Sequence, residues 1–323
     1  MDLDELVQNP NFKRMFPEKR ELPFFIWDGK VREVLGSSYH NLLAGFSPED
    51  FDVLILKLSA NVTHKSDPTE RDKVLKGIET QIKYALGSDK RVIVVASGAR
   101  AYGEESLPEG SNPVDVYRTG QRLLMNKFRK MDLNVKEFLL TPESMRDTQL
   151  RQQELGKILE CCNQDYVPVL NVDDVARIKE DAELRREFSS NDVLACRYVA
   201  PAVKELGNKP LIIMLGSEAG IYEKESYRRY TCDKNVRFPN VIRVVLNGTG
   251  LESQIIPERE SAKGTGGLGT KLEAIEFAKK AGIPIMMAQG FQYNQGSLLQ
   301  GCWPVIALLD KRYVGTIFKP RGD

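Results

Sequence analysis

The sequence predicts an α/β fold in which an open, mainly parallel sheet is sandwiched by helices. From residue 53 onward, short apolar runs alternate with longer segments whose apolar residues recur at helical spacing. The apolar runs are nearly continuous, which is typical of strands buried on both faces of a parallel sheet. A chain of 323 residues with 41% hydrophobic residues can also bury the large core that this architecture requires.

Strands and helices alternate along the whole body of the chain. Parallel strands need a crossover between them, and a helix usually supplies it. Ligands of such folds lie beyond the carboxyl ends of the strands, so functional residues should follow directly after the apolar runs. We expect strands at residues 53–58, 92–96, 135–140, 167–170, 211–215, 241–246, 284–288 and 313–318, and helices at 72–86, 115–131, 151–162, 193–206 and 271–281.

Residues 1–50 differ from the rest of the chain. Proline and aromatic residues alternate there with charged ones, without a clear period. We expect an N-terminal extension that packs on a body formed by residues 51–323. Within that body, residues 252–269 form the longest polar, glycine-rich stretch and are expected to be a mobile loop.

The charge pattern argues against a nucleic-acid or membrane partner. Lysine and arginine number 46 and acidic residues 45, and no long block carries one sign. The acidic N-terminus does not resemble a secretory signal, and no apolar stretch approaches the ~20 residues that span a bilayer. We therefore expect a soluble, cytoplasmic protein. Two histidines, and five cysteines without a CxxC pair, predict neither a metal site nor a disulfide framework.

A glycine-rich segment, Gly264-Thr-Gly-Gly-Leu-Gly269, matches the G-x-G-x-x-G pattern of dinucleotide-binding turns. That pattern needs a strand immediately before it, whereas the preceding residues are polar, which argues against a nicotinamide cofactor. A Walker A loop needs lysine directly after the last glycine, where Thr270 stands instead. The segment still suits a polyphosphate, because Lys271 begins an amphipathic helix whose free N–H groups favour an anion. The alternative is a flexible loop followed by a capped helix.

The same segment closely resembles the signature of glutamate 5-kinases, which belong to the amino acid kinase superfamily. It continues as Thr265-Gly-Gly-Leu-Gly-Thr-Lys-Leu-Glu-Ala-Ile-Glu-Phe-Ala-Lys-Lys-Ala-Gly-Ile283. In the family, a T-G-G-M-x-T-K-L run is followed by a helix and then by A-G-I.

Further blocks appear in the order that the family has, over roughly residues 53 to 318. They are Val92-Ile-Val-Val-Ala-Ser-Gly-Ala-Arg-Ala-Tyr-Gly103, similar to a strand and S-S-G-A-I-A-x-G; Gly120-Gln121 and Phe138-Leu-Leu-Thr141, similar to V-G-Q and L-L-T; Val167-Pro-Val-Leu-Asn-Val-Asp-Asp-Val175, similar to V-P-I-I-N-E-N-D-x-V; Ser190-Asn-Asp-Val-Leu-Ala195, similar to G-D-N-D-x-L-S-A; residues 211–222, similar to L-L-L-T-D-x-x-G-L-Y; and Gly315-Thr-Ile-Phe318, similar to G-T-L-F.

The resemblance implies an ATP- and Mg²⁺-dependent kinase that phosphorylates the side-chain carboxylate of glutamate or a similar small amino acid, in proline biosynthesis. It implies an amino acid kinase fold with a substrate lobe at about residues 51–205 and a nucleotide lobe at about 206–323. A homo-oligomer is expected. The PUA domain that follows the kinase domain in many relatives is not expected, because the chain ends at Asp323.

Specific residues inherit roles from the family pattern. Lys57 and Lys271 would flank the transferring phosphoryl group, and Asp192 would hold the two ammonium groups in place. The residues implied to bind the amino-acid acceptor are Ser97, Gly98, Ala99, Asn171, Asp174 and Asn191. Those implied to bind the nucleotide are Ser217, Tyr222, Thr265, Gly266, Gly267 and Lys271.

This set of residues suits phosphoryl transfer. The transition state spreads negative charge over oxygens, so fixed cations and in-line positioning matter more than a base. A carboxylate nucleophile has no proton to remove. Each residue could also have a purely structural role: asparagine and aspartate often cap helices after strands, and Lys57 could be an exposed lysine whose stem lies along the core.

Three departures from the family pattern leave other functions open. Leu58-Ser59-Ala60-Asn61 replaces a glycine-containing turn, Gly216-Ser217-Glu218 replaces T-D, and Ser190 replaces an acid. Arg100, in the substrate loop, could recognise an additional carboxylate or phosphate, or it could pair with a surface acid. The alternatives are therefore a kinase for phosphate or phosphonate monoesters, and a nucleotide- or amino-acid-binding regulator without transfer activity.

Overall fold

The computed structural model describes residues 46–179, 187–188, 190–217, 220–222, 241–242, 244–245, 268–290, 303–310 and 315–320. Within these residues the main sheet has eight strands. Their order across the sheet is β3 (Val135–Leu140), β4 (Val167–Val172), β2 (Arg91–Ala96), β1 (Val53–Leu58), β5 (Pro210–Gly216), β9 (Ile285–Gln289), β10 (Thr316–Phe318) and β8 (Val244–Val245). Two further short strands, β6 (Ile221–Tyr222) and β7 (Val241–Ile242), pair with each other.

The sheet is parallel except at one pair, in which β10 runs antiparallel to β9. The predicted open, mainly parallel sheet is thereby confirmed. The strand expected at residues 241–246 differs, because its two halves pair with different neighbours: β7 joins β6, and β8 joins β10. The expected N-terminal extension up to residue 45 and the expected loop at residues 252–267 lie outside the described residues.

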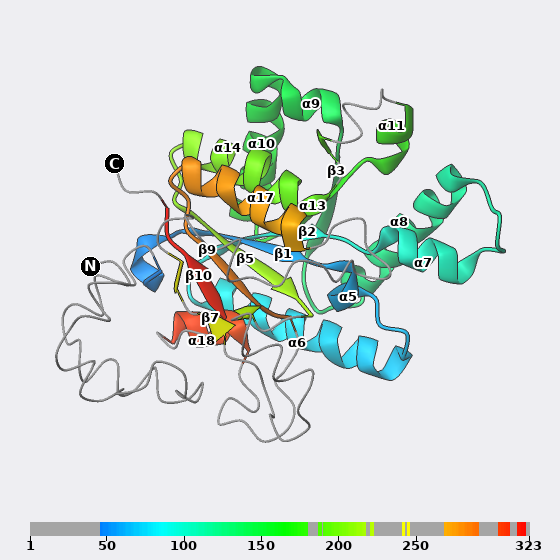
Figure 1. Cartoon of the computed structure of the whole chain (residues 1–323), viewed down its shortest axis with the longest axis horizontal. Coiled ribbons are helices and arrows are strands. Elements are labelled where there is room, and N and C mark those ends of the chain that lie inside the picture. The colour runs from blue at the N-terminus through cyan, green and yellow to red at the C-terminus, as the bar shows by residue number, and fades with distance from the viewer. Residues whose placement is uncertain are drawn as a thin grey trace.

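Helices cover both faces of the sheet (Figure 1). One layer contains α6 (Pro68–Gly87), α8 (Pro113–Arg129) and α18 (Pro304–Leu309). The other contains α10 (Thr148–Asn163), α17 (Leu268–Lys280) and a continuous helix formed by α13 (Asn191–Val193), the π-helical η2 (Leu194–Val199) and α14 (Ala200–Glu205). The shorter helices are η1 (Pro48–Asp50), α5 (Ala60–Thr63), α7 (Ala99–Ser106), α9 (Pro142–Arg146) and α11 (Asp174–Lys179). None of the helices in the described ranges is long and apolar enough to cross a bilayer.

Aspartate and asparagine caps fix where the long helices begin. Asp67 accepts hydrogen bonds from the amides of Thr69 and Glu70, and Asn112 accepts one from Val114. Each cap is followed by proline, which is pre-organised for the first helical position. Because of Asp67, α6 begins four residues before the helix expected at residues 72–86.

Strand β1 lies in the middle of the sheet, between β2 and β5. Its side chains alternate between the two layers, as the strand period requires. Leu54, Leu56 and Leu58 belong to the core beneath α6 and α8. Val53 and Ile55 belong to the core beneath α10, α14 and α17. Lys57 has the same parity as Val53 and Ile55, so it faces the layer that contains α13 and α17.

Two glycines allow α7 and α8 to approach each other closely. A Cβ on Gly120 would lie 1.7 Å from the carbonyl oxygen of Ala99, and one on Gly103 would lie 2.0 Å from that of Val116. Both contacts are to backbone atoms, which cannot move aside cheaply. The close packing of α7 against α8 therefore depends on glycine at both positions, and it fixes where Ala99 lies.

We expect Gly120→Ala to destabilise the protein by about 2 kcal/mol, because overpacking a well-filled contact costs roughly 1–3 kcal/mol. The substitution should also raise the KM for the acceptor, since it displaces Ala99 at the start of α7. Chemical denaturation and steady-state kinetics measure the two effects. Gly156→Ala in α10 is the matched control: no atom lies within 4 Å of its added Cβ, so this variant should be neutral or slightly stabilised. Equal behaviour of the two variants would contradict the prediction.

Candidate active site

Three charged residues meet beyond the carboxyl half of β1. The Nζ atom of Lys57 lies 2.5 Å from Oδ1 of Asp192, and the Nζ atom of Lys271 lies 3.5 Å from Oδ2 of the same carboxylate. Lys57 and Asp192 are buried, with 4% of each side chain exposed, whereas Lys271 is 20% exposed. Two ammonium groups from distant parts of the chain therefore share one carboxylate, and Lys271 reaches solvent.

Each member of this triad is placed by a different element. Lys57 is the fifth residue of β1 and is paired in register with Val95 and Met214 of the neighbouring strands. Asp192 lies in the first turn of α13, where the Ser190 hydroxyl accepts a hydrogen bond from the amide of Val193. Ser190, which departs from the family pattern, is thus a helix cap. Lys271 is in the first turn of α17. The buried position of Lys57 rules out the exposed-lysine alternative.

Burial and the neighbouring charges shift the pKa values of Lys57 and Asp192. Burial lowers the pKa of Lys57 below its ordinary value of 10.5, and the Lys271 ammonium lowers it further, although Asp192 acts to raise it. Burial alone would raise the pKa of Asp192, but attraction to Lys57 and then to Lys271 lowers it below its ordinary value. Asp192 is therefore an anion that keeps two cations at the carboxyl end of β1.

A second group of side chains joins the ends of β2 and β4. The Nδ2 atom of Asn191 lies 2.7 Å from Oδ1 of Asn171 and 3.1 Å from Oγ of Ser97. The amide of Asn171 donates in turn to Gln121 of α8, at 2.8 Å. The predicted acceptor-binding residues Ser97, Asn171 and Asn191 are thus neighbours in space. Neither asparagine caps a helix in this arrangement.

The remaining predicted acceptor residues lie around the same point. Gly98 has a φ of 112°, a left-handed conformation that favours glycine, and it precedes α7. Ala99 and Asp174 line a pocket of about 330 Å³ that Gln121 also lines. Asp173, between β4 and α11, accepts hydrogen bonds from the amides of Val175 and Ala176 and so acts as the helix cap there.

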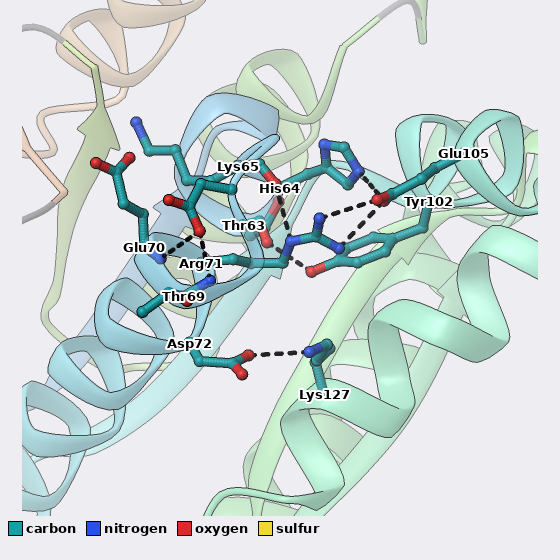
Figure 2. A network of polar contacts seen from close by, with 11 residues as sticks. Thr63, His64, Lys65, Thr69, Glu70, Arg71, Asp72, Tyr102, Glu105 and Lys127 are labelled. Atoms are coloured by element: carbon teal, nitrogen blue, oxygen red, sulfur yellow. Dashed lines mark hydrogen bonds and ion pairs between the residues drawn. The ribbon is translucent and has the colours of Figure 1, made fainter.

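A polar cluster that includes Thr63 and Tyr102 (Figure 2) adjoins the loop that contains Ser97. The hydroxyl of Thr63 donates to the carbonyl oxygen of Ser97 at 2.6 Å, and the hydroxyl of Tyr102 donates to the carbonyl oxygen of Thr63 at 2.7 Å. Burial raises the pKa of Tyr102 to about 12, so its hydroxyl stays protonated and able to donate. These bonds tie α5, which follows β1, to α7, which follows β2.

Ion pairs hold the outer side of this cluster. Arg71 of α6 donates through both terminal nitrogens to Glu105 of α7, each at 3.1 Å, and its Nε donates to the carbonyl oxygen of Lys65. His64 Nε2 lies 2.7 Å from the same Glu105 carboxylate. The hydrogen bond from Arg71, followed by that from His64, lowers the pKa of Glu105. The turn after β1 and the loop after β2 are therefore held as one unit.

Arg100 does not reach the pocket as a recognition group. Its Nε donates to Glu104 one turn along α7, at 2.6 Å, and more than half of each side chain is exposed. The surface ion pair considered in the sequence analysis is the arrangement that the structure adopts.

The predicted nucleotide-binding residues are only partly described. Ser217 follows β5 directly, and Tyr222 lies in β6, with its side chain outside the described part. Thr265, Gly266 and Gly267 fall outside the described residues. Neighbouring strands are about 4.8 Å apart, so Ser97 and Ser217 are separated by about 10 Å, with β1 between them. Lys57 thus lies between the acceptor side and the predicted nucleotide side of the sheet.

The altered turn after β1 keeps a polar group inside the site. The amide of Ser59 donates to the carbonyl oxygen of Leu215, which extends the pairing of β1 with β5. The buried Oγ of Ser59 has no hydrogen-bond partner among the described residues. This hydroxyl follows Lys57 by two residues and is free to donate to a phosphate oxygen.

Comparison with known proteins gives consistent relatives. The chain is 25% identical over 251 residues to the glutamate 5-kinase of Alkaliphilus metalliredigens, covering 75% of this chain and 89% of the relative. It is 23% identical over 304 residues to the glutamate 5-kinase of Treponema pallidum, covering 83% and 96%. The chain resembles glutamate 5-kinases over most of its length. The glutamate 5-kinase of Dictyoglomus thermophilum, 25% identical over 283 residues, covers 84% of this chain and is itself covered for 68%.

Solved structures are related more distantly. Isopentenyl phosphate kinase of T. acidophilum has a TM-score of 0.47 and 14% identity, with coverage of 83% of this chain and 100% of that one. UMP kinase of Ureaplasma parvum has a TM-score of 0.45 and 12% identity, with coverage of 83% and 99%. No protein-family model matches the chain.

Some residues of the site region were given no role from the sequence. Thr63 and Tyr102 position the Ser97 loop, and Gln121 was noted only as part of a sequence landmark. Arg118 and Arg122 line the pocket from α8. Besides the landmark that contains Gln121, only the two arginines carried a signal in the sequence, namely a repeat of like charge one helical turn apart, which solvated helix faces also show.

Proposed function

We propose that this protein is a kinase that transfers the γ-phosphoryl group of ATP to the side-chain carboxylate of glutamate or a similar small amino acid. The products are ADP and an acyl phosphate, an intermediate suited to proline biosynthesis. The observation that supports this function best is the contact of Lys57 and Lys271 with the two oxygens of Asp192, between the acceptor residues and Ser217. Similarity to glutamate 5-kinases supports the same reaction.

The residues present fit a nucleoside triphosphate. Lys57 and Lys271 supply two positive charges against the single charge of Asp192, and Ser59 supplies an unused buried hydroxyl. No group of three or more histidine, cysteine, aspartate or glutamate side chains that could hold a metal occurs in the described ranges. Mg²⁺ would be held chiefly by the phosphate oxygens, and it would supply further neutralisation of their charge.

In this mechanism the acceptor carboxylate oxygen attacks the γ-phosphorus. A new P–O bond forms as the bond to the bridging oxygen breaks, and ADP leaves with that electron pair. No proton is removed, since the nucleophile is already an anion. Lys57 and Lys271 stabilise the charge that spreads over the γ-phosphoryl oxygens, and Asp192 positions both lysines. Asn171, Asn191 and Asp174 orient the acceptor through hydrogen bonds to its polar groups.

An ADP-release assay with a panel of acceptors tests the proposal. We expect Mg²⁺-dependent ADP release with L-glutamate or a close relative, and trapping of the acyl phosphate as a hydroxamate when hydroxylamine is present. ADP release with phosphate monoesters alone would replace this function by the monoester kinase. Calorimetric ATP binding without turnover of any acceptor would indicate a binding protein instead.

A further inference from the structure

The pocket beside the acceptor residues is lined by two arginines that form no ion pair with the described residues. Arg118 and Arg122 both line it, with Ala99, Gln121 and Asp174. Neither arginine has a hydrogen-bond or ion-pair partner among the described residues. All other arginines with described side chains have one: Arg71, Arg91, Arg100, Arg129, Arg146, Arg151 and Arg197.

Two acids of the same pocket, Glu137 and Asp173, have hydrogen-bond partners other than Arg118 and Arg122. Glu137 of β3 accepts from Gln121 at 2.9 Å and lies 3.5 Å from Arg129. Asp173 accepts from two amides at the start of α11. Of the pocket acids, Asp174 is the one that the family pattern implies to receive an ammonium group. The pocket is therefore lined by three arginines and three acids, and Arg118 and Arg122 are the two of these arginines that form no ion pair with a described residue.

The spacing of the two arginines strengthens this conclusion. Arg118 and Arg122 are four residues apart on α8, so they lie on the same side of the helix. Like charges at this spacing repel each other and destabilise a helix unless an anion lies between them. Guanidinium groups bind carboxylates and phosphates through paired hydrogen bonds, which suits them to a small anionic ligand.

We propose that Arg118 and Arg122 form an anion subsite that binds a second negatively charged group of the acceptor, remote from the carboxylate that receives the phosphoryl group. The ligand is therefore a small acceptor with two anionic groups, the second being a carboxylate or a phosphate. This inference rests on the proposed function, and it names the substrate class of the same site. Asp174, which lines the same pocket, then accepts from an ammonium group of the acceptor.

Kinetics with paired acceptors tests the subsite. L-Glutamate and its α-amide differ by one carboxylate, and the wild type should prefer the free acid. In an Arg118→Gln/Arg122→Gln variant, kcat/KM for glutamate should fall by about 10- to 100-fold, because hydrogen bonds to charged groups contribute about 1.5–3 kcal/mol. The value for the α-amide and the KM for ATP should stay within about twofold, so the preference between the acceptors disappears.

Lys127→Gln is the matched control. It removes one positive charge from the same helix, but Lys127 is paired with Asp72 of α6 at 2.9 Å and lies outside the pocket (Figure 2). Its kinetics should equal those of the wild type. Because Arg118 and Arg122 are exposed and repel each other, the double variant should melt at or slightly above the wild-type temperature, and a thermal scan checks this.

Direct binding separates failure of the subsite from failure of the proposed function. Calorimetric titration of glutarate, inorganic phosphate and O-phospho-L-serine into the wild type and the double variant needs no turnover. A tenfold or greater loss of affinity in the variant supports the subsite even if no acceptor is phosphorylated, and the anion that binds more tightly identifies the second group. Affinities within twofold for every anion, together with an unchanged preference between the two acceptors, would overturn the proposal.

Discussion

Replacing Lys271 with methionine lowers kcat for phosphoryl transfer by at least about 10²- to 10³-fold, and Lys57→Met has an effect of the same size. Removing one pre-organised charge that stabilises the transition state typically costs this much. Both ammonium groups lie within 3.5 Å of the single buried carboxylate of Asp192, so neither can move over to replace the other. Single-turnover measurement of ADP formation isolates the chemical step from product release.

A lysine on the same helix provides the control for this prediction. Lys280 ends α17, is exposed, and lies more than two turns from Lys271. Lys280→Met removes the same charge and should keep wild-type kinetics. If the Lys271 variant retained more than about a tenth of the wild-type rate, its ammonium group would have no part in the transfer step.

The Asp192→Asn variant should lose both stability and activity. Lys57 then stays buried without an anionic partner, and breaking a buried ion pair from one side costs about 3–5 kcal/mol. Because Asp192 acts to raise the pKa of Lys57, its neutralisation lowers that pKa further, and less of the ammonium form remains for catalysis. Chemical denaturation measures the free energy of unfolding, and the ADP assay measures the rate.

A double variant distinguishes the two roles of the pair. Lys57→Met combined with Asp192→Asn removes both charges, so it should recover most of the lost stability while the activity stays absent. As a control for burial, Asp132→Asn removes an equally close partner, 2.6 Å from Lys83, but 93% of the Asp132 side chain is exposed. This control should unfold like the wild type. An Asp192→Asn protein as stable as this control would refute the buried-pair account.

The sequence predicted the architecture well because periodicity reports burial. The strand at residues 53–58 was predicted with the bounds that the structure has, since a short apolar run between helical segments is typical of a strand in a parallel sheet. The bounds of the strand at residues 135–140 were also predicted, although this strand lies at the edge of the sheet and only Leu140 is buried. The run at residues 241–246 was predicted as one strand, whereas the structure has two short strands, β7 and β8, within it. A short apolar run carries no information about which neighbour it joins, and here its two halves join different ones.

The site could be predicted as far as the family pattern reached. Lys57, Asp192 and Lys271 were named together from ordered sequence blocks, although they are separated by up to 214 residues, and they meet in space. Their catalytic role stays a prediction. The hydrogen bonds that position the neighbouring loops could not be predicted from the sequence. Contacts such as that of Thr63 with Ser97 depend on how α5 and α7 pack. Arg118 and Arg122 look like ordinary surface charges until the pocket is seen.

The π-helical stretch η2 gives the helix after Asp192 one residue to spare. A π turn contains one residue more than the α turn that it replaces, and both complete one turn of the helix. Deleting a single residue between Leu194 and Val199 would therefore regularise the helix and leave its first turn, which carries Asp192, facing β1. A deletion within α14 has no such turn to absorb it, so it would rotate Asp192 by about 100° about the helix axis. The carboxylate would then point away from the two lysines.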